Sequence, residues 1–177
     1  MLSGHLQGRI LKMLVRMINP RRVLEIGTFT GYSAISMAEG LLHPDGKVYT
    51  IEIDDEMEDF VRNSINGSNF KDNIEWIIGD ARKIIPTFEN EFFDLAFIDA
   101  DKRYYWEHFN LLLPKIAPGG FILADNTLWG GKVVEEIENN DYQTKGILEF
   151  NEKLAQDQRV EKVILPVRDG LTLIRKK

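Results

Sequence analysis

An apolar, β-branched run that passes through an acid into a glycine-containing loop constrains this chain more than any other feature. The run is Val23-Leu24-Glu25-Ile26, the loop contains Gly27 and Gly31, and a helical pattern follows from residue 32 to residue 42. A buried strand that turns through glycines into a helix is how open α/β sheets form a site for a nucleotide-sized ligand. The sequence therefore predicts such a site at the end of its first strand.

The spacing of the loop residues narrows the class of ligand. The dinucleotide fingerprint G-x-G-x-x-G would require glycines where Phe29 and Tyr32 stand, which disfavours an NAD-dependent dehydrogenase. The phosphate-loop pattern G-x-x-x-x-G-K-[ST] is also absent from the sequence. The remaining pattern, E-x-G-x-x-x-G, suits a ligand without a pyrophosphate but with a cationic or hydroxyl-rich group. S-adenosylmethionine is such a ligand.

Strand-like and helix-like segments alternate along the chain. The predicted strands are 22–26, 47–53, 74–78, 93–98 and 121–124. The predicted helices are 6–18, 32–42, 54–65, 81–85, 104–113 and 146–156. Five strand–helix alternations favour an α/β fold with a parallel sheet and helices on both faces. Two last strands, 161–165 and 171–175, are joined by a turn with Asp169-Gly170 and are expected to be antiparallel.

Length and composition limit the classes of protein. A chain of 177 residues is expected to form one domain, residues 1–177. The net charge of −6 argues against binding to bulk nucleic acid, and the absence of cysteine removes disulfides and thiolate metal sites. No apolar run reaches the roughly 18 residues that span a bilayer. The first residues lack a signal-peptide pattern, so a cytoplasmic protein is expected.

Acidic side chains stand near the ends of the predicted strands, which share one edge of a parallel sheet where ligands bind. These acids are Glu25, Glu52, Asp54, Asp80, Asp99, Asp101 and Asp125. An acid in this position often only caps the next helix, and we expect this of Asp54 and Asp55. For Asp80, capping and ligand binding are both open.

Capping does not easily explain Asp99 together with Asp125-Asn126, which leave adjacent strand ends and are expected to converge. Two carboxylates at such a short distance repel each other unless a cation neutralises them. Mg²⁺ accepts two or three protein oxygens together with water, so the sequence predicts a divalent metal here. A zinc site is disfavoured because His5, His43 and His108 are scattered and thiols are absent.

Lys102 stands three residues after Asp99, at the start of a predicted helix. A lysine in such a position is usually a solvated surface charge. Beside a bound dication, however, its pKa would fall, because a second positive charge disfavours the ammonium form. This makes Lys102 a candidate general base.

The chain resembles the class I S-adenosylmethionine-dependent O-methyltransferases, in particular the cation-dependent branch with the caffeoyl-CoA and catechol O-methyltransferases. The resemblance covers essentially the whole chain. It is carried by LEIGTFTGYS at 24–33, IEID at 51–54, GDA at 79–81, FIDADKRYY at 97–105, GGFILADNTLWGGKV at 119–133 and LPVRDGLTLIRK at 165–176. It implies a Rossmann-like, seven-stranded, mostly parallel sheet whose last strand is antiparallel.

The resemblance also implies the site residues. The cofactor-binding residues would be Ser3, Glu25, Gly27, Thr28, Ser33, Glu52, Asp80, Ala81 and Asp101. Within this set, Glu52 would bind the ribose hydroxyls, and Asp80 and Ala81 would border the adenine. The metal ligands would be Asp99, Asp125 and Asn126, with Mg²⁺ preferred over Mn²⁺ or Ca²⁺. Lys102 would be the base, so that Lys102 and Asp99 form the catalytic pair.

The implied reaction is metal-dependent methyl transfer from S-adenosylmethionine to a hydroxyl of a catechol-like small molecule, by a homodimer. Two departures from the family affect this expectation. The helical segment that precedes the position of Met1 in relatives is expected to be absent, which bears on substrate affinity and dimerisation. Gly130 replaces an asparagine that contacts substrate in the plant enzymes, which argues against the same phenylpropanoid specificity.

Two other functions stay open from the sequence. One is a methyltransferase acting on hydroxylated uridine in tRNA, for which Arg9, Lys12, Arg16, Arg21 and Arg22 are candidate contacts. The other is a cofactor-binding or dimerisation module without catalysis. The long polar segment 127–145, with Trp129, is a candidate lid and acceptor wall, although Trp129 packing in the core is an equal alternative.

Overall fold

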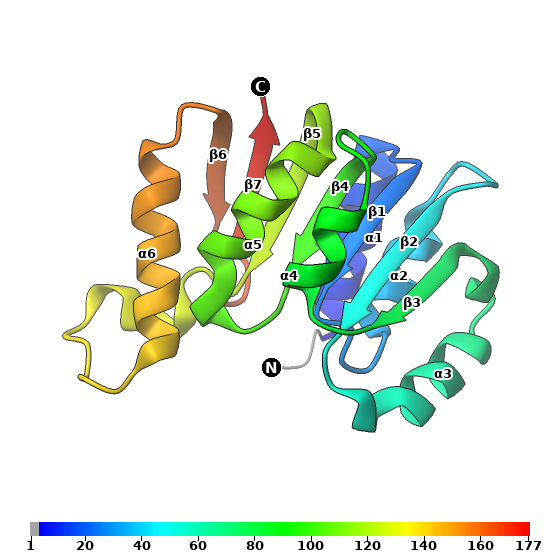
Figure 1. Cartoon of the computed structure of the whole chain (residues 1–177), viewed down its shortest axis with the longest axis horizontal. Coiled ribbons are helices and arrows are strands. Elements are labelled where there is room, and N and C mark those ends of the chain that lie inside the picture. Colours follow the sequence, from blue (N-terminus) through cyan, green and yellow to red (C-terminus); the bar gives the residue numbers. More distant parts are fainter. Residues whose placement is uncertain (1–3) are drawn as a thin grey trace.

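A computed structural model describes residues 4–177, which form one seven-stranded sheet with helices on both faces (Figure 1). The strands are β1 Arg22–Ile26, β2 Lys47–Glu52, β3 Ile74–Ile78, β4 Phe93–Ile98, β5 Ile116–Asp125, β6 Val160–Leu165 and β7 Leu171–Lys176. The helices are α1 His5–Ile18, α2 Tyr32–Gly40, α3 Glu58–Asn66, α4 Ala81–Ile84, α5 Tyr105–Leu112 and α6 Tyr142–Gln156. Short 3₁₀ turns extend several of these ends, including η4 Lys102–Tyr104 and η6 Trp129–Val134.

The strand order is β3-β2-β1-β4-β5-β7-β6. All neighbouring pairs from β3 to β5 are parallel, whereas β7 runs antiparallel to both β5 and β6 (Figure 1). This confirms the expected mostly parallel sheet with an antiparallel last strand. From β1 the chain continues outward on one side to β2 and β3, and then crosses to the other side of β1 to form β4. The direction in which strands are added to the sheet therefore reverses between β1 and β4. Ligands bind at such a switch point, outside the carboxyl ends of the strands.

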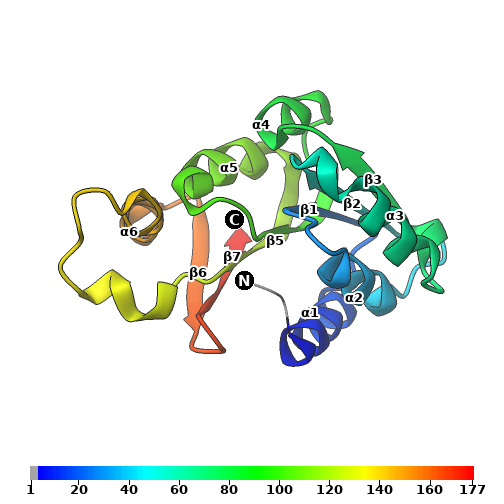
Figure 2. The ribbon, with the colours of Figure 1, turned by 90° about the horizontal axis from the view of Figure 1, so that it is seen from below.

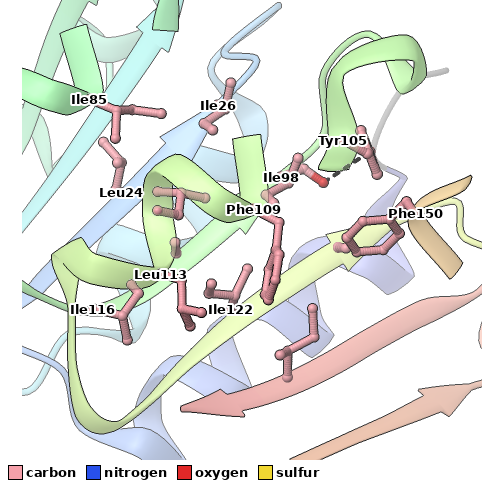
Figure 3. Close-up of a cluster of buried hydrophobic side chains, with 14 of the residues drawn as sticks. Leu24, Ile26, Ile85, Ile98, Tyr105, Phe109, Leu113, Ile116, Ile122 and Phe150 are labelled. Carbon is pink, nitrogen blue, oxygen red and sulfur yellow. Dashed lines mark hydrogen bonds between the residues drawn. The ribbon is translucent and has the colours of Figure 1, made fainter. Parts of the chain in front are cut away.

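Two helix layers bury the two faces of the sheet (Figure 2). Helices α1, α2 and α3 cover one face and share a core with Val23, Leu95 and Phe97. Helices α4, α5 and α6 cover the other face, where the core contains Leu24 and Ile98 (Figure 3). Because successive strand residues point to opposite faces, a strand covered on both sides is apolar throughout, as β1 and β4 nearly are.

The start of the fifth strand was predicted wrongly. The predicted strand covers only residues 121–124, but β5 already begins at Ile116 and includes Pro118-Gly119-Gly120. Phe93 of β4 pairs with Ile116, and Leu95 pairs with Phe121, so the register of β5 against β4 shifts between these two pairs. Residues 117–120 lie at this irregularity within the strand. Gly120 permits it, because a Cβ there would lie 2.7 Å from the carbonyl oxygen of Asp94.

The polar segment after β5 is partly helical. It contains η6, and α6 begins at Tyr142, four positions before the predicted start at Gly146. The Asp141 side chain caps α6 by accepting from the Thr144 N–H at 3.0 Å. No helix within residues 4–177 is long and apolar enough to cross a membrane.

Candidate active site

A cavity of about 850 Å³ lies over the carboxyl ends of the strands at the switch point. Its lining comes from the segments that follow β1 to β5, together with His108 of α5 and Gln143 of α6. Nine of the residues predicted to bind the cofactor or the metal line it: Gly27, Thr28, Ser33, Glu52, Asp80, Ala81, Asp99, Asp101 and Asn126. Lys102 lines it as well. Glu25 and Asp125 of the predicted set do not line the cavity, and Ser3 lies outside the described residues.

Gly27 lets the loop after β1 pass directly beside the end of β4. Its φ angle of 97° is strained for any residue with a side chain, and a Cβ would lie 2.1 Å from the carbonyl oxygen of Asp99. The Gly27 N–H donates to the Ile51 carbonyl at 2.9 Å, and the Asp99 N–H donates to the Ile26 carbonyl at 3.0 Å. The loop after β1 and the acids after β4 are thus held together by backbone contacts.

Glu25 lies beneath this loop and is completely buried. It accepts a hydrogen bond from Thr50 Oγ1 at 2.5 Å, and its Oε1 atom has no partner among the described residues. Burial raises the pKa of Glu25 from 4.5 to about 8, with a smaller contribution from the negative charge of Asp99. A pKa of about 8 favours the neutral carboxyl at pH 7, and Glu25 does not line the cavity.

We expect the proton on Glu25 to make the cofactor-free protein less stable as the pH rises from about 4.5 to 8. Between these values the folded state keeps a proton that the unfolded state releases. The group then lowers the unfolding free energy by about 1.4 kcal/mol per pH unit. Glu25→Gln should remove this slope, as measured by urea unfolding at pH 6 and pH 8. The exposed Glu89→Gln is the control, and an identical pH dependence in Glu25→Gln and wild type would contradict the assignment.

Glu52, at the end of β2, is held by three backbone N–H groups. Its Oε2 accepts from Phe29 at 2.7 Å, and its Oε1 accepts from Ile53 at 2.9 Å and Asp54 at 3.1 Å. Asp54 itself caps the following 3₁₀ turn, as expected, by accepting from the Glu56 N–H. Glu52 therefore stands at the cavity wall in a fixed orientation, where it also fixes the glycine loop through Phe29.

The wall after β3 combines Asp80 with Arg82, Tyr104 and His108, which were not among the predicted site residues. Asp80 caps α4 and also forms a two-point ion pair with Arg82, which lowers the pKa of Asp80 to about 2. Arg82 lies over the ring of Tyr104 at 4.5 Å. His108, which falls in the predicted helix 104–113, also lines this wall one helical turn after Tyr104. Burial lowers the pKa of His108 to about 4, so its imidazole is neutral.

Lys102 is buried, in contrast to the usual solvated lysine, with 4% of its surface exposed. Its Nζ donates to Tyr105 Oη at 2.5 Å and to Asp99 Oδ1 at 3.3 Å. Burial lowers the pKa of Lys102, and the charges of Asp99 and Asp125 oppose that shift. Tyr105 Oη also lies within hydrogen-bond distance of the carbonyls of Ile98 and Asp125, so it ties the lysine to the ends of β4 and β5.

Asp125 and Asn126 are both buried at the end of β5. Burial raises the pKa of Asp125, and the negative charge of Asp99 raises it further. Asn126 has a φ angle of 56°, a left-handed conformation that asparagine tolerates better than most residues. Asp169, which we predicted only as part of a turn, adds a third carboxylate near Lys102, and its negative charge raises the pKa of Lys102. The buried Oδ2 of Asp169 has no hydrogen-bond partner among residues 4–177.

The residues at the ends of β4 and β5 fit a hard divalent cation by their chemistry. Asp99, Asp125 and Asn126 offer only oxygen and amide donors, and the two carboxylates are close enough for Asp99 to raise the pKa of Asp125. Lys102 supplies one positive charge against these two negative charges. Within residues 4–177, no group of three His, Cys, Asp or Glu side chains is placed to hold a metal ion. The candidate set depends on the Asn126 amide as its third ligand.

The sheet order, the antiparallel β7 and the cavity over the switch point define the class of Rossmann-like methyltransferases. The chain belongs to the O-methyltransferase family, whose model matches residues 1–177.

Sequence and structure relatives agree with this assignment. Caffeoyl-CoA O-methyltransferase from Populus kitakamiensis is 36% identical, over 96% of this chain and 76% of its own length. The O-methyltransferase from Bacillus cereus in complex with SAH superposes with a TM-score of 0.90 and 34% identity, over 98% of this chain and 82% of that one. The O-methyltransferase TomG from Streptomyces achromogenes, in complex with SAM, superposes with a TM-score of 0.90 and 32% identity, over 99% of this chain and 82% of that one. The protein is therefore an S-adenosylmethionine-dependent O-methyltransferase of the caffeoyl-CoA O-methyltransferase type.

Proposed function

We propose that this enzyme methylates one hydroxyl of a catechol-like small molecule and that it needs a divalent cation, Mg²⁺ first among the alternatives. One observation carries the proposal: at the cavity wall, next to the glycine loop, the buried Lys102 donates to the Asp99 carboxylate and also feels the negative charge of Asp125. The relatives support it, because caffeoyl-CoA O-methyltransferases are among them.

We assign to the residues the roles that the family resemblance implies. Gly27, Thr28, Ser33 and Asp101 would contact the methionine part of S-adenosylmethionine, together with the buried Glu25 and with Ser3, which lies outside the described residues. Glu52 would receive the ribose, and Asp80 and Ala81 would border the adenine. Asp99, Asp125 and Asn126 would hold the cation, which supplies Lewis-acid polarisation of the acceptor oxygens when it is bound.

Lys102 would then receive the proton of the acceptor hydroxyl at its Nζ atom. Burial favours the neutral amine that this role requires, and Tyr105 holds Nζ in place through its hydroxyl. The deprotonated acceptor oxygen forms a bond to the methyl carbon as the bond from that carbon to sulfur breaks. Holding the two reactants in line can contribute roughly 7–11 kcal/mol to the rate acceleration.

A methyl-transfer assay with and without EDTA tests this function. We expect transfer to catechol but not to phenol, which lacks the second hydroxyl, and caffeoyl esters and hydroxyuridine tRNA are assayed beside them. EDTA should abolish transfer, while S-adenosylhomocysteine binding, measured by calorimetry, should persist, because the cofactor loop does not use the cation. Full activity in EDTA would contradict the metal requirement, and transfer only to hydroxyuridine tRNA would favour the RNA alternative.

The structure offers no specific support for the tRNA alternative. Of its candidate basic contacts, Lys12 is paired with Glu39 and Arg21 with Asp45.

We also propose a homodimer, supported by the exposed apolar side chains Leu6, Met13 and Met17 on α1. Sedimentation equilibrium would test it, and a monomer at assay concentration would contradict it. The cytoplasmic location stays a prediction.

A further inference from the structure

Gln7, in the first turn of α1, is buried, with 5% of its surface exposed, although glutamine is mostly a surface residue. Its Nε2 donates to Asp125 Oδ2 at 2.6 Å, and its Oε1 accepts from Arg168 Nη1 at 2.7 Å. One amide thus joins three segments far apart in the sequence: α1, the end of β5 and the turn between β6 and β7.

Arg168 fixes which end of the amide meets Asp125. The oxygen and nitrogen of a glutamine amide are often hard to distinguish by position alone. A guanidinium group only donates hydrogen bonds, so the amide oxygen must face Arg168. The NH₂ group therefore faces the Asp125 carboxylate and acts as a fixed donor.

We propose that Gln7 is a positioning residue that holds the Asp125 carboxylate in the orientation needed to bind the divalent cation. This inference rests on the proposed metal-dependent function. Asp125 is buried at the end of β5, with 4% of its surface exposed, and the Gln7 Nε2 donor at its Oδ2 fixes the plane of its carboxylate. Because the amide is neutral, it does so without placing another positive charge beside the cation. Partners of this kind orient metal ligands, and their loss typically weakens metal binding about 10- to 100-fold.

A role in packing alone predicts a different outcome. Helix α1 is already held by its buried Leu11 and Val15, and by Gly8, where a Cβ would lie 2.7 Å from the side chains of Ser36 and Tyr32. Lys12 adds a second polar tie from α1, to Glu39 of α2 at 2.5 Å. Removing the Gln7 amide should therefore change the geometry of Asp125 more than the attachment of α1.

The test is Mn²⁺ binding, followed by the electron paramagnetic resonance signal of free Mn²⁺, in wild type, Gln7→Leu and Lys12→Met. Leucine approximates the volume of glutamine but makes no hydrogen bond, whereas Lys12→Met removes a polar tie of α1 that does not reach Asp125. We expect Gln7→Leu to weaken Mn²⁺ binding about 10- to 100-fold. Lys12→Met should bind Mn²⁺ as wild type does, and S-adenosylhomocysteine affinity should stay within about twofold in both variants.

Arg168→Met is the second variant, and it decides the question if Gln7→Leu does not fold. It leaves Gln7 in place but frees the amide to turn, so we expect weaker Mn²⁺ binding, by about 3- to 10-fold. Wild-type Mn²⁺ affinity in folded Gln7→Leu, or equal losses in Gln7→Leu and Lys12→Met, would overturn the positioning role alone. Absence of Mn²⁺ binding by the wild type would overturn the metal requirement and this inference with it.

Discussion

Replacing Lys102 with methionine is expected to lower kcat by about 10²–10⁴-fold, because the acceptor proton loses its base. Methionine keeps most of the buried volume but cannot accept a proton, so the fold and the cofactor loop should persist. S-adenosylhomocysteine affinity should therefore change little. Initial rates of methyl transfer, measured under saturating cofactor, provide the readout.

The pH profile distinguishes a base from a structural lysine. Burial lowers the pKa of Lys102, and the active form is the neutral amine, so the wild-type rate should rise with pH through that pKa. Lys102→Met should lose this rise. The control is Lys115→Met, since Lys115 donates to the Phe88 carbonyl and lies outside the cavity lining. A pH–rate profile of Lys102→Met that matches the wild type would rule out the role of base.

Asp99→Asn is expected to reduce methyl transfer by on the order of 10²–10³-fold, because the site loses one of its two carboxylates for the cation. The substitution is close to isosteric and keeps the backbone hydrogen bond from residue 99 to Ile26. It also removes the negative charge that opposes the lowered pKa of Lys102. Mn²⁺ affinity should fall together with the rate, while thermal stability should change little.

Asp94→Asn is the matched control for Asp99→Asn. Asp94 belongs to the same strand, β4, but accepts from the N–H groups of Arg21 and Arg22 at the opposite end. We expect it to affect stability modestly and Mn²⁺ affinity not at all. If Asp99→Asn turned over at the wild-type rate, Asp99 would not be a metal ligand.

The sequence predicted the fold well because its strands are short, apolar and separated by helical patterns of the right length. β1, β3 and β4 begin and end where the hydrophobic pattern places them. The start of β5 was missed, because Pro118-Gly119-Gly120 has the composition of a turn. What keeps it in the sheet is the close packing of Gly120 on the Asp94 carbonyl, which is a contact distant in sequence.

The site was predicted where acids follow strands and was missed where helices and turns contribute. Asp99, Asp125 and Asn126 could be proposed as one group because adjacent parallel strands end at the same edge of the sheet. Gln7 and His108 belong to helices and Asp169 to a turn, and no local sequence pattern separates them from surface residues. The burial of Glu25 and Lys102, which shifts the pKa of each, depends on the packing of several elements and cannot be read from either residue's neighbours in sequence.

The arrangement of the last two strands imposes an order on folding. β6 precedes β7 in the chain, yet β7 lies between β5 and β6 in the sheet, so β6 cannot join the sheet before β7 has inserted. Asp125 pairs with Leu171, the first residue of β7, and the Thr127 N–H donates to the Gly170 carbonyl. During synthesis on the ribosome, the cofactor half at β1 and β2 can therefore form early, whereas the half around Asp125 must wait for β7 to emerge. A nascent chain stalled before β7 would expose the edge of β5 to other chains.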